Sequence, residues 1–218
     1  MRRNKKSTFE PDLLYNWGNE RLTKKHQEPY LSYFKDVPGT VLEIGCGRGV
    51  FLGLLKDAGI DAYGIDSSEQ TVRYCRKKGL HALHGDAFNH LASLSRNSLG
   101  GIFCGHVIEH LEPTYAVRLI KESYRVLKRG GRLIIITPNP KDLRTTERFW
   151  LDITHVRLYP EKLLVTLLKR EGFTRIRVLE GREPARNPLE KMAKLFLKAW
   201  FMGFMYRGDL IVMAERGK

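Results

Sequence analysis

Cysteine is scarce in this sequence, with only three residues among 218, at Cys46, Cys75 and Cys104. No two of them form a CxxC pair, so we expect no cysteine-based metal centre, and we assign no metal ligands from the sequence. Their odd number and wide spacing also exclude a disulfide framework. Free thiols suit a reducing compartment, so we expect the chain in the cytoplasm.

Long apolar runs are also absent. No stretch approaches the roughly 20 apolar residues that a helix needs to cross a bilayer. The N-terminus is basic, beginning Met1-Arg2-Arg3, but polar and acidic residues follow where a secretory signal needs an apolar segment. We therefore expect neither a secretory signal nor a membrane span.

Acidic residues are few relative to basic ones, and the formal net charge is +14. An excess of this size favours encounters with anions, namely nucleic acid, phosphorylated metabolites or acidic membrane surfaces. It does not choose among these partners. The chain is 42% hydrophobic, which is enough for one sizeable core.

Short apolar segments rich in β-formers alternate with amphipathic segments along most of the chain. Such alternation predicts an α/β fold, with a doubly wound parallel sheet covered by helices on both faces. We expect a basic tail and cap helices over residues 1–38, followed by the main domain over 39–218. The expected strands are 40–44, 62–65, 81–83, 101–106, 132–137, 175–179 and 210–214, and the expected helices are 13–34 (one or two), 50–58, 68–78 (capped by Ser67 or Ser68), 113–127 and 161–170.

Glycines and carboxylates follow the first three expected strands. Residues 45–49 form a glycine-rich loop directly after Glu43-Ile44, and Asp66 and Asp86 end the next two strands. Ligands bind at the carboxyl ends of strands in such sheets, although each acid could instead cap a helix. Val50 occupies the third glycine place of a dinucleotide loop, and Glu43 would repel a pyrophosphate. Glu43 suits a ligand that carries an ammonium and a sulfonium.

Five segments in order resemble the motifs of class I S-adenosylmethionine-dependent methyltransferases, especially the group typified by ubiquinone-biosynthesis methyltransferases. They are VLEIGCGRG (41–49), YGIDSS (63–68), GDAF (85–88), GIFCGHVIEHL (101–111) and LKRGGRLIIITPN (127–139). The resemblance implies a seven-stranded, Rossmann-like sheet whose last strand is antiparallel, and S-adenosyl-L-methionine as the cofactor. The cofactor-binding residues that it implies are Glu43, Gly45, Cys46, Gly47, Asp66, Ser67, Asp86, Ala87, Gly105 and His106.

Within that assignment, Glu43, Gly45 and Gly47 would lie near the methionine part of the cofactor. Asp66 would bind the ribose hydroxyls, and Asp86 with Ala87 the adenine. Gly105 and His106 would line the sulfonium side.

A second resemblance lies after the fifth expected strand. The sequence DITHVR (152–157) resembles a stretch in bacterial methyltransferases of cell-surface polysaccharide assembly. It implies an anionic small-molecule or glycan acceptor, methylated at oxygen. We predict His155 as a general base oriented by Asp152, with Arg157 binding an anionic group. In the alternative, His155 and Asp152 only stabilise the loop.

Residues 187–206 separate the last two expected strands and have the pattern of an amphipathic helix. Leu189 and Phe196 share one face, while Lys191 and Lys194 share the opposite face. Such a helix could lie in a membrane interface and bring a lipid-linked substrate to the site. A lid over the site or a homodimer contact explains the pattern more simply.

Three other functions compete with small-molecule methyl transfer. The charge favours a nucleic-acid methyltransferase, but 105–108 reads GHVI where base-amino enzymes have N/D-P-P-Y/F. A non-catalytic binding module with a methyltransferase fold is the second rival, and the intact acidic and glycine-rich edge argues against it. A nicotinamide oxidoreductase is disfavoured by Glu43 and Val50. The acceptor, the methylated atom, the oligomeric state and any metal requirement cannot be read from the sequence.

Overall fold

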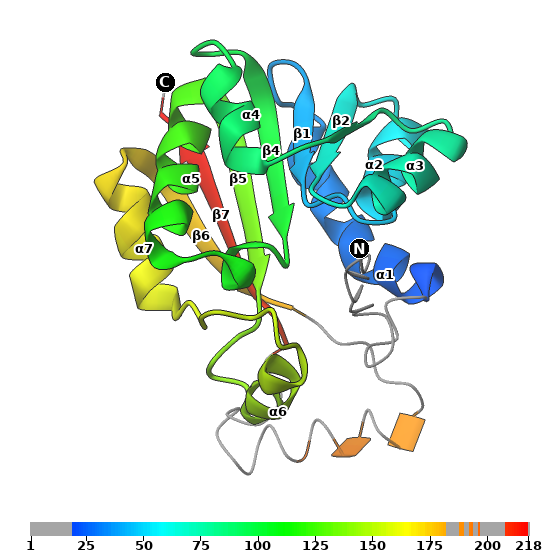
Figure 1. The fold of residues 1–218 in the computed structure, drawn as a ribbon. Coiled ribbons are helices and arrows are strands. Elements are labelled where there is room, and N and C mark those ends of the chain that lie inside the picture. The colour runs from blue at the N-terminus through cyan, green and yellow to red at the C-terminus, as the bar shows by residue number, and fades with distance from the viewer. Residues whose placement is uncertain (1–18, 182–187, 190–191, 194–195, 197–207, 218) are drawn as a thin grey trace, which may run out of the picture.

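A single seven-stranded sheet organises the protein, in a computed structural model that describes residues 19–181, 188–189, 192–193, 196 and 208–217. The strand order is β3-β2-β1-β4-β5-β7-β6, and β7 is antiparallel to both of its neighbours. The other pairs are parallel (Figure 1). The predicted fold class is confirmed. The strands are β1 (Val41–Ile44), β2 (Ala62–Asp66), β3 (Ala82–His84), β4 (Leu99–Gly105), β5 (Leu127–Thr137), β6 (Phe173–Glu180) and β7 (Leu210–Arg216).

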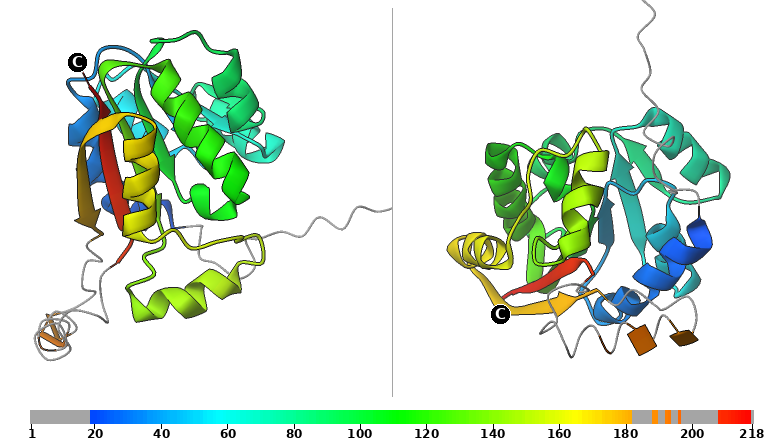
Figure 2. Two further views of the ribbon diagram at one scale, coloured as in Figure 1. Left: turned by 90° about the vertical axis from the view of Figure 1, so that its left-hand side faces the viewer. Right: turned by 90° about the horizontal axis from the view of Figure 1, so that it is seen from below.

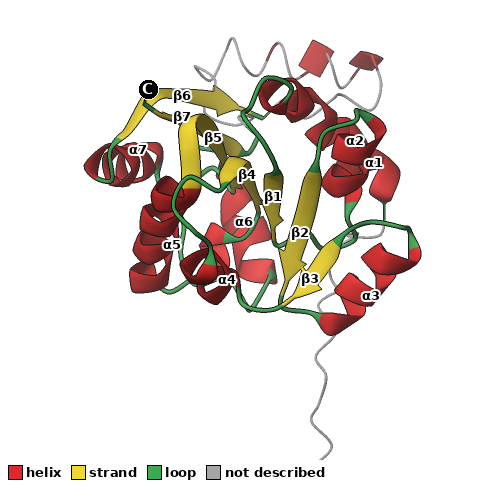
Figure 3. Ribbon diagram, turned by 90° about the horizontal axis from the view of Figure 1, so that it is seen from above, coloured by secondary structure: helices red, strands yellow, loops and turns green. Residues whose placement is uncertain are grey.

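Helices cover both faces of the sheet (Figure 3). One face is covered by α4 (Ala87–Ser93), α5 (Pro113–Val126) and α7 (Glu161–Arg170). The other is covered by α1 (Glu20–Gln27), the 3-10 helix η2 (Glu28–Phe34), α2 (Val50–Asp57) and α3 (Glu69–Lys77). Central strands buried on both faces explain why their sequences are continuous apolar runs.

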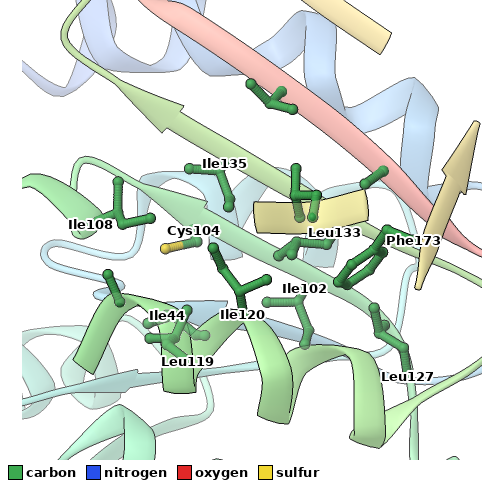
Figure 4. Close-up of a cluster of buried hydrophobic side chains, with 14 of the residues drawn as sticks. Ile44, Ile102, Cys104, Ile108, Leu119, Ile120, Leu127, Leu133, Ile135 and Phe173 are labelled. Atoms are coloured by element: carbon green, nitrogen blue, oxygen red, sulfur yellow. The ribbon is translucent and has the colours of Figure 1, made fainter. Parts of the chain in front are cut away.

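The core has a separate cluster on each face of the sheet. On the first face, Ile102, Leu133 and Ile135 of the central strands pack with Leu119 and Ile120 of α5 (Figure 4). On the second, three aromatic rings dominate: Phe51 stacks on Phe103 with ring centroids 3.9 Å apart, and Phe34 meets Phe51 edge-on. These clusters fix the central strands, and with them the carboxyl edge of the sheet.

The start of β5 differs from the sequence expectation. We predicted a helix to residue 127 and a turn over 129–131, but α5 ends at Val126 and β5 begins at Leu127. The pairing with β4 jumps from Leu99↔Leu127 to Gly101↔Arg132, so the expected turn is an irregularity inside a strand. A Cβ on Gly131 would lie 2.8 Å from the carbonyl oxygen of Lys128, which explains glycine at this point.

Two helices of the structure, α4 and α6 (Leu143–Leu151), are not among those that the sequence predicts. α4 has only seven residues and buries only Leu91, so it leaves almost no periodic signal. α6 lies beyond the carboxyl ends of the strands, outside both helical layers (Figure 2). It buries Phe149 and leaves Trp150 70% exposed, and it lies outside the alternation of strands and covering helices from which we predicted the elements.

Two predicted helical segments, 13–34 and 187–206, are described only in part. The predicted helical region 13–34 is described from residue 19 onward, as α1 and η2. Most of the predicted amphipathic segment 187–206 lies outside the described residues; 188–189, 192–193 and 196 are helical. Within the described part of the chain, no helix combines the length and the apolar character required to cross a bilayer.

Candidate active site

The buried polar side chains of the described residues concentrate at one edge of the sheet. Glu43 is the second-last residue of β1, Thr137 ends β5, and Glu109 lies in a short 3-10 helix, η3 (Ile108–His110), just after β4. Asn139 and Asp142 follow β5 and are also buried. This edge carries the carboxyl ends of the parallel strands, where ligands bind in open α/β sheets.

The glycine-rich loop after β1 is held against the end of β2. The amides of Gly45 and Cys46 donate to the carbonyl of Ile65, at 2.8 and 3.2 Å. Gly47 has a φ of +48°, and a Cβ built on it would meet no heavy atom within 4 Å. The backbone at Gly47 is therefore open to close approach by a ligand. The side chain of Cys46 is buried in a small core cluster with Leu52, so only its backbone faces the loop region.

Glu43 is a buried carboxylate without a full set of partners. Its side chain is almost wholly inaccessible, and its Oε2 atom has no hydrogen-bond partner among the described residues. Burial raises the pKa of Glu43 well above the ordinary value, and the nearby Cys75 and Asp66 raise it further, while the Leu52 amide opposes the shift. A buried carboxylate in this state requires a proton or a cation.

Asp66 is fixed by the loops on either side of it. Its Oδ2 accepts the amide of Gly47 at 2.8 Å, and its Oδ1 accepts the amide of Ser68 at 2.8 Å and the hydroxyl of Thr71 at 3.1 Å. These bonds set the direction of the carboxylate and leave a further lone pair on Oδ2. Ser67 is exposed beside it, and its carbonyl lies 3.1 Å from Nε2 of His84.

Asp86 lies at the next strand end and caps α4. Its Oδ1 accepts the amide of Asn89 at 2.8 Å, so the helix-cap alternative describes one of its roles. Ala87 is the first residue of that helix. The Gly85 amide donates to the carbonyl of Asp66 at 3.0 Å, which joins the ends of β2 and β3. Glu43, Asp66 and Asp86 therefore occupy three hydrogen-bonded, adjacent strand ends.

His106 follows Gly105 at the end of β4 and has a left-handed backbone, with a φ of +54°. This conformation is uncommon for residues other than glycine and clusters at functional sites. The Nδ1 of His106 lies 3.1 Å from Oε1 of Glu109, and its Nε2 lies 3.4 Å from Asp209. Burial by itself lowers the pKa of His106, but the two carboxylates outweigh it and raise the pKa well above the ordinary value.

The predicted acceptor residues lie in the loop after α6, and this loop is anchored to η3. The amides of Val156 and Arg157 both donate to the carbonyl of Glu109, at 2.8 and 3.1 Å. The Arg157 side chain is exposed, with its guanidinium 5.7 Å from the centre of the Tyr159 ring. The sequence stretch 152–157 thus reaches the same edge as the predicted cofactor residues.

His155 and Asp152 are close but are not directly hydrogen-bonded. The Nδ1 of His155 is 2.7 Å from the carbonyl of Phe149, while its Nε2 is 3.9 Å from Oδ2 of Asp152. The Oδ1 of Asp152 instead accepts the amide and the hydroxyl of Thr154. The imidazole is therefore oriented by Phe149, on whose ring it also stacks. Its catalytic role stays a prediction.

Several residues of this edge were not singled out from the sequence. Glu109 is fully buried and accepts the Thr137 hydroxyl at 3.1 Å. Asp142 accepts the amide of Gly208 at 2.9 Å and so fixes the chain just before β7. A polar residue directly after a strand end was the available signal, as in Thr137-Pro138-Asn139. A separate hollow of about 320 Å³, lined partly by Lys56, Asp61 and His81, lies at the opposite edge of the sheet.

The family model and the similar solved structures both point to methyltransferases. A family model described as a methyltransferase domain matches residues 42–135. The crystal structure of an S-adenosylmethionine-dependent methyltransferase from Archaeoglobus fulgidus superposes with a TM-score of 0.78 and 26% identity, covering 90% of this chain and 94% of that one. The seven-stranded fold and the family model thus agree.

Three curated relatives match over parts of the chain. A probable S-adenosylmethionine-dependent methyltransferase of Mycolicibacterium smegmatis is 30% identical, over 61% of this chain and 51% of its own length. A ubiquinone biosynthesis O-methyltransferase of Idiomarina loihiensis is 29% identical, over 45% and 42%. The mRNA cap guanine-N(7) methyltransferase of Schizosaccharomyces pombe is 31% identical, over 72% and 50%. The matches span about half the length of these relatives.

Proposed function

Because the chain belongs to the class I S-adenosylmethionine-dependent methyltransferases, we propose that it transfers the methyl group of S-adenosylmethionine to a hydroxyl oxygen of a small-molecule or glycan acceptor. One observation carries the proposal. Glu43, a buried carboxylate that needs a proton or a cation, lies beside an open glycine loop and the oriented carboxylate of Asp66.

The described residues fit this cofactor. The buried Oε2 of Glu43 suits the ammonium of the methionine part, and Gly47 allows close approach of the backbone, whereas Gly45 makes room for Val107 and so shapes the loop. Asp66, with Ser67, would bind the ribose hydroxyls, and Asp86 with Ala87 the adenine. Gly105 and His106 would lie on the sulfonium side, and Cys46 would contribute only its backbone.

When bound, the cofactor supplies an electrophilic methyl group on sulfur. The protein aligns the acceptor oxygen with that methyl and excludes water, and such orientation can lower a barrier by roughly 7–11 kcal/mol at best. His155 would take the hydroxyl proton at Nε2, because its Nδ1–H is held by the Phe149 carbonyl. Asp152 would stabilise the resulting cation, and the exposed Arg157 would bind an anionic group of the acceptor.

RNA or another nucleic acid is the alternative acceptor. The net charge of +14 and the similarity to the fission-yeast cap methyltransferase favour it. The sequence after β4, Gly105 to Ile108, lacks the element with which base-amino enzymes stack a flipped base. A non-catalytic binding module is a second alternative, and the oriented carboxylates at three strand ends argue against a decayed site.

Finer details of the acceptor extend the same proposal. The resemblance of 152–157 to polysaccharide methyltransferases points to a glycan, whereas the curated relatives are named for ubiquinone and an mRNA cap. Contact of 187–206 with an inner membrane surface would bring a lipid-linked acceptor to the site, and a homodimer contact is the other use of this segment. Leu189, Met192 and Phe196 are exposed there, as either role requires.

Calorimetric titration tests the cofactor assignment. We expect saturable binding of S-adenosylmethionine and S-adenosylhomocysteine and none of NAD⁺. Asp66→Asn replaces an acceptor oxygen by a donor and should weaken both affinities by about tenfold or more, close to 1.4 kcal/mol. Asp57→Asn, an exposed change on the end of α2, is the matched control and should bind as the wild type does.

If the folded protein binds neither S-adenosylmethionine nor S-adenosylhomocysteine, the proposed enzymatic function is wrong and a non-catalytic binding module is favoured. Methyl transfer from labelled cofactor to hydroxyl-bearing small molecules or glycans is expected next. Incorporation into RNA instead would select the nucleic-acid alternative.

A further inference from the structure

Three side chains with ligand atoms for metals converge beside the predicted acceptor position. Glu109 and His110 come from η3, and His155 comes from the loop after α6. One ligand atom of each lies within 4.8 Å of the other two. Glu109 is fully buried, and the two histidines are partly buried, with their ring centroids 4.5 Å apart. Residues 45 positions apart in sequence thus form one cluster.

We propose that Glu109, His110 and His155 bind a divalent transition-metal ion, with Zn²⁺ as the best match. The site goes beyond the proposed methyl transfer, because its formation requires neither cofactor nor acceptor.

Hydrogen bonds fix which nitrogen of each histidine carries the proton. The Phe149 carbonyl can only accept, so Nδ1 of His155 donates to it and Nε2 keeps its lone pair. Thr154 donates its single hydroxyl proton to Asp152, at 2.6 Å, so its oxygen accepts from Nδ1 of His110, at 2.8 Å. Both histidines therefore present unprotonated Nε2 atoms. Histidine ligands of metals are oriented by the same kind of partner, a carbonyl or a carboxylate network.

Glu109 is supported as firmly as the histidines. Its Oε1 accepts from Nδ1 of His106 and its Oε2 from the Thr137 hydroxyl, each at 3.1 Å. Each carboxylate oxygen has a second lone pair that can bind a metal. The Glu109 carbonyl also anchors the amides of Val156 and Arg157, which ties the two parts of the cluster together.

The cluster brings two imidazole rings and a carboxylate together at short range. Two imidazole lone pairs and a carboxylate within 4.8 Å repel one another unless a cation or proton lies among them. The carboxylate of Asp152, 3.9 Å from Nε2 of His155, adds negative charge beside the cluster. A bound cation removes this repulsion, and the supporting hydrogen bonds stay intact.

The ligand set selects the metal. Two imidazole nitrogens and one carboxylate suit Zn²⁺ and its first-row neighbours, whereas Mg²⁺ and Ca²⁺ prefer oxygen ligands. Tetrahedral zinc needs ligand atoms about 3.3 Å apart, so atoms that lie within 4.8 Å of one another must close by roughly 1.5 Å at most. Three protein ligands leave one position open. Occupation of that position by the acceptor hydroxyl rests on the proposed function, and His155 would then be a ligand rather than a proton acceptor.

Titration of untagged, chelator-stripped protein with ZnCl₂ tests the site. We expect one Zn²⁺ per chain. His110→Gln and His155→Gln should each weaken Zn²⁺ binding by about 10–100-fold. Loss of a residue that only hydrogen-bonds a metal ligand already lowers metal affinity by this much. His26→Gln is the matched control, because His26 is exposed on α1, and it should leave the affinity unchanged. Circular dichroism establishes that each variant is folded, and Glu109→Gln replaces any histidine variant that is not.

Two results would overturn the proposal: no stoichiometric Zn²⁺ binding by the wild type, or equal binding by the wild type and the folded ligand variants. The site and the proposed function fail separately. Asp66→Asn should lose cofactor affinity while it still binds Zn²⁺. A protein that binds S-adenosylmethionine but no Zn²⁺ would remove only the metal site.

Discussion

Glu43 shows how a single residue can serve binding at the expense of stability. Its carboxylate is buried, one of its oxygens has no partner among the described residues, and burial raises its pKa well above the ordinary value. Below pH 4.5 the group is neutral in both folded and unfolded chains. As the pH rises further, the folded state must hold a proton or bury a charge, so stability falls.

Glu43→Gln should therefore stabilise the ligand-free protein at pH 7–8, by about 1–3 kcal/mol, because it removes a poorly compensated buried carboxylate. The same change should weaken S-adenosylmethionine binding, since the cation loses its partner. Denaturant unfolding across the pH range checks the first effect, and calorimetry checks the second. The stability difference should vanish below about pH 4.5; a difference that persists there would show that the charge is not its cause.

At the same scale, the sequence predicted positions better than contacts. Asp66 and Asp86 lie at strand ends as expected, but only the structure shows Asp66 bonded to Gly47 and Asp86 capping α4. The pairing of Asp152 with His155 was expected to be direct, whereas Phe149 orients the imidazole. Hydrogen-bond partners depend on atoms brought together by folding, which residue types and spacing do not specify.

The start of α3, the helix after β2, is set by a single capping residue. Either Ser67 or Ser68 could have capped it, and Ser68 does, since its Oγ accepts the amide of Thr71 at 3.3 Å. Ser67 is exposed and leaves its side chain outside the cap. The position of the helix start therefore decides that the Ser68 hydroxyl, and not that of Ser67, accepts a free amide of the first turn.

Ser68→Ala should lower the free energy of unfolding by about 1 kcal/mol, because an amide of the first turn loses its partner. For a chain of this size, that corresponds to roughly 2–4 °C in Tm. Thermal unfolding measures it, with Ser67→Ala as the control expected to leave Tm unchanged. Equal losses in the two variants would contradict the assignment of the cap.

The sequence predicted the helices that pack an apolar face against the sheet, and it did not predict α4 and α6. α2, α3, α5 and α7 pack on the sheet and have apolar faces, so their sequences reveal them. α4 is short and buries only Leu91, and α6 lies off the sheet, outside the alternation of strands and covering helices. Residues 129–131 have the composition of a turn, but they lie within β5, where its pairing with β4 is irregular.

The whole molecule is strongly basic and exposes apolar side chains near the carboxyl edge. Trp150 and Ile153 are about 70% exposed, and Leu189, Met192 and Phe196 are exposed in the segment between β6 and β7. Basic charge combined with apolar side chains is the pattern of a protein that lies on an anionic membrane surface.

Vesicle co-sedimentation at low and high salt separates charge from apolar insertion. We expect binding to phosphatidylglycerol-containing vesicles at low salt, little binding to phosphatidylcholine alone, and partial retention at 1 M salt, where the Debye length falls to about 3 Å. Leu189→Ser with Met192→Ser should reduce the retained fraction. Complete release at high salt would leave charge as the only contact and contradict insertion through 187–206.

The sequence by itself determined the alternation of strands and helices, the glycine loop and the acids at strand ends, because these depend on neighbours within a few residues. Only the tertiary structure decided the strand order around β7, the partners of Glu109 and the meeting of His110 with the loop at Thr154. These features depend on segments tens of residues apart, which are joined by burial of a shared core and not by local pattern. The hydrogen-bond network around Glu109 and His155 therefore emerged from the fold, whereas the glycine loop and the acids at strand ends were already visible in the chain.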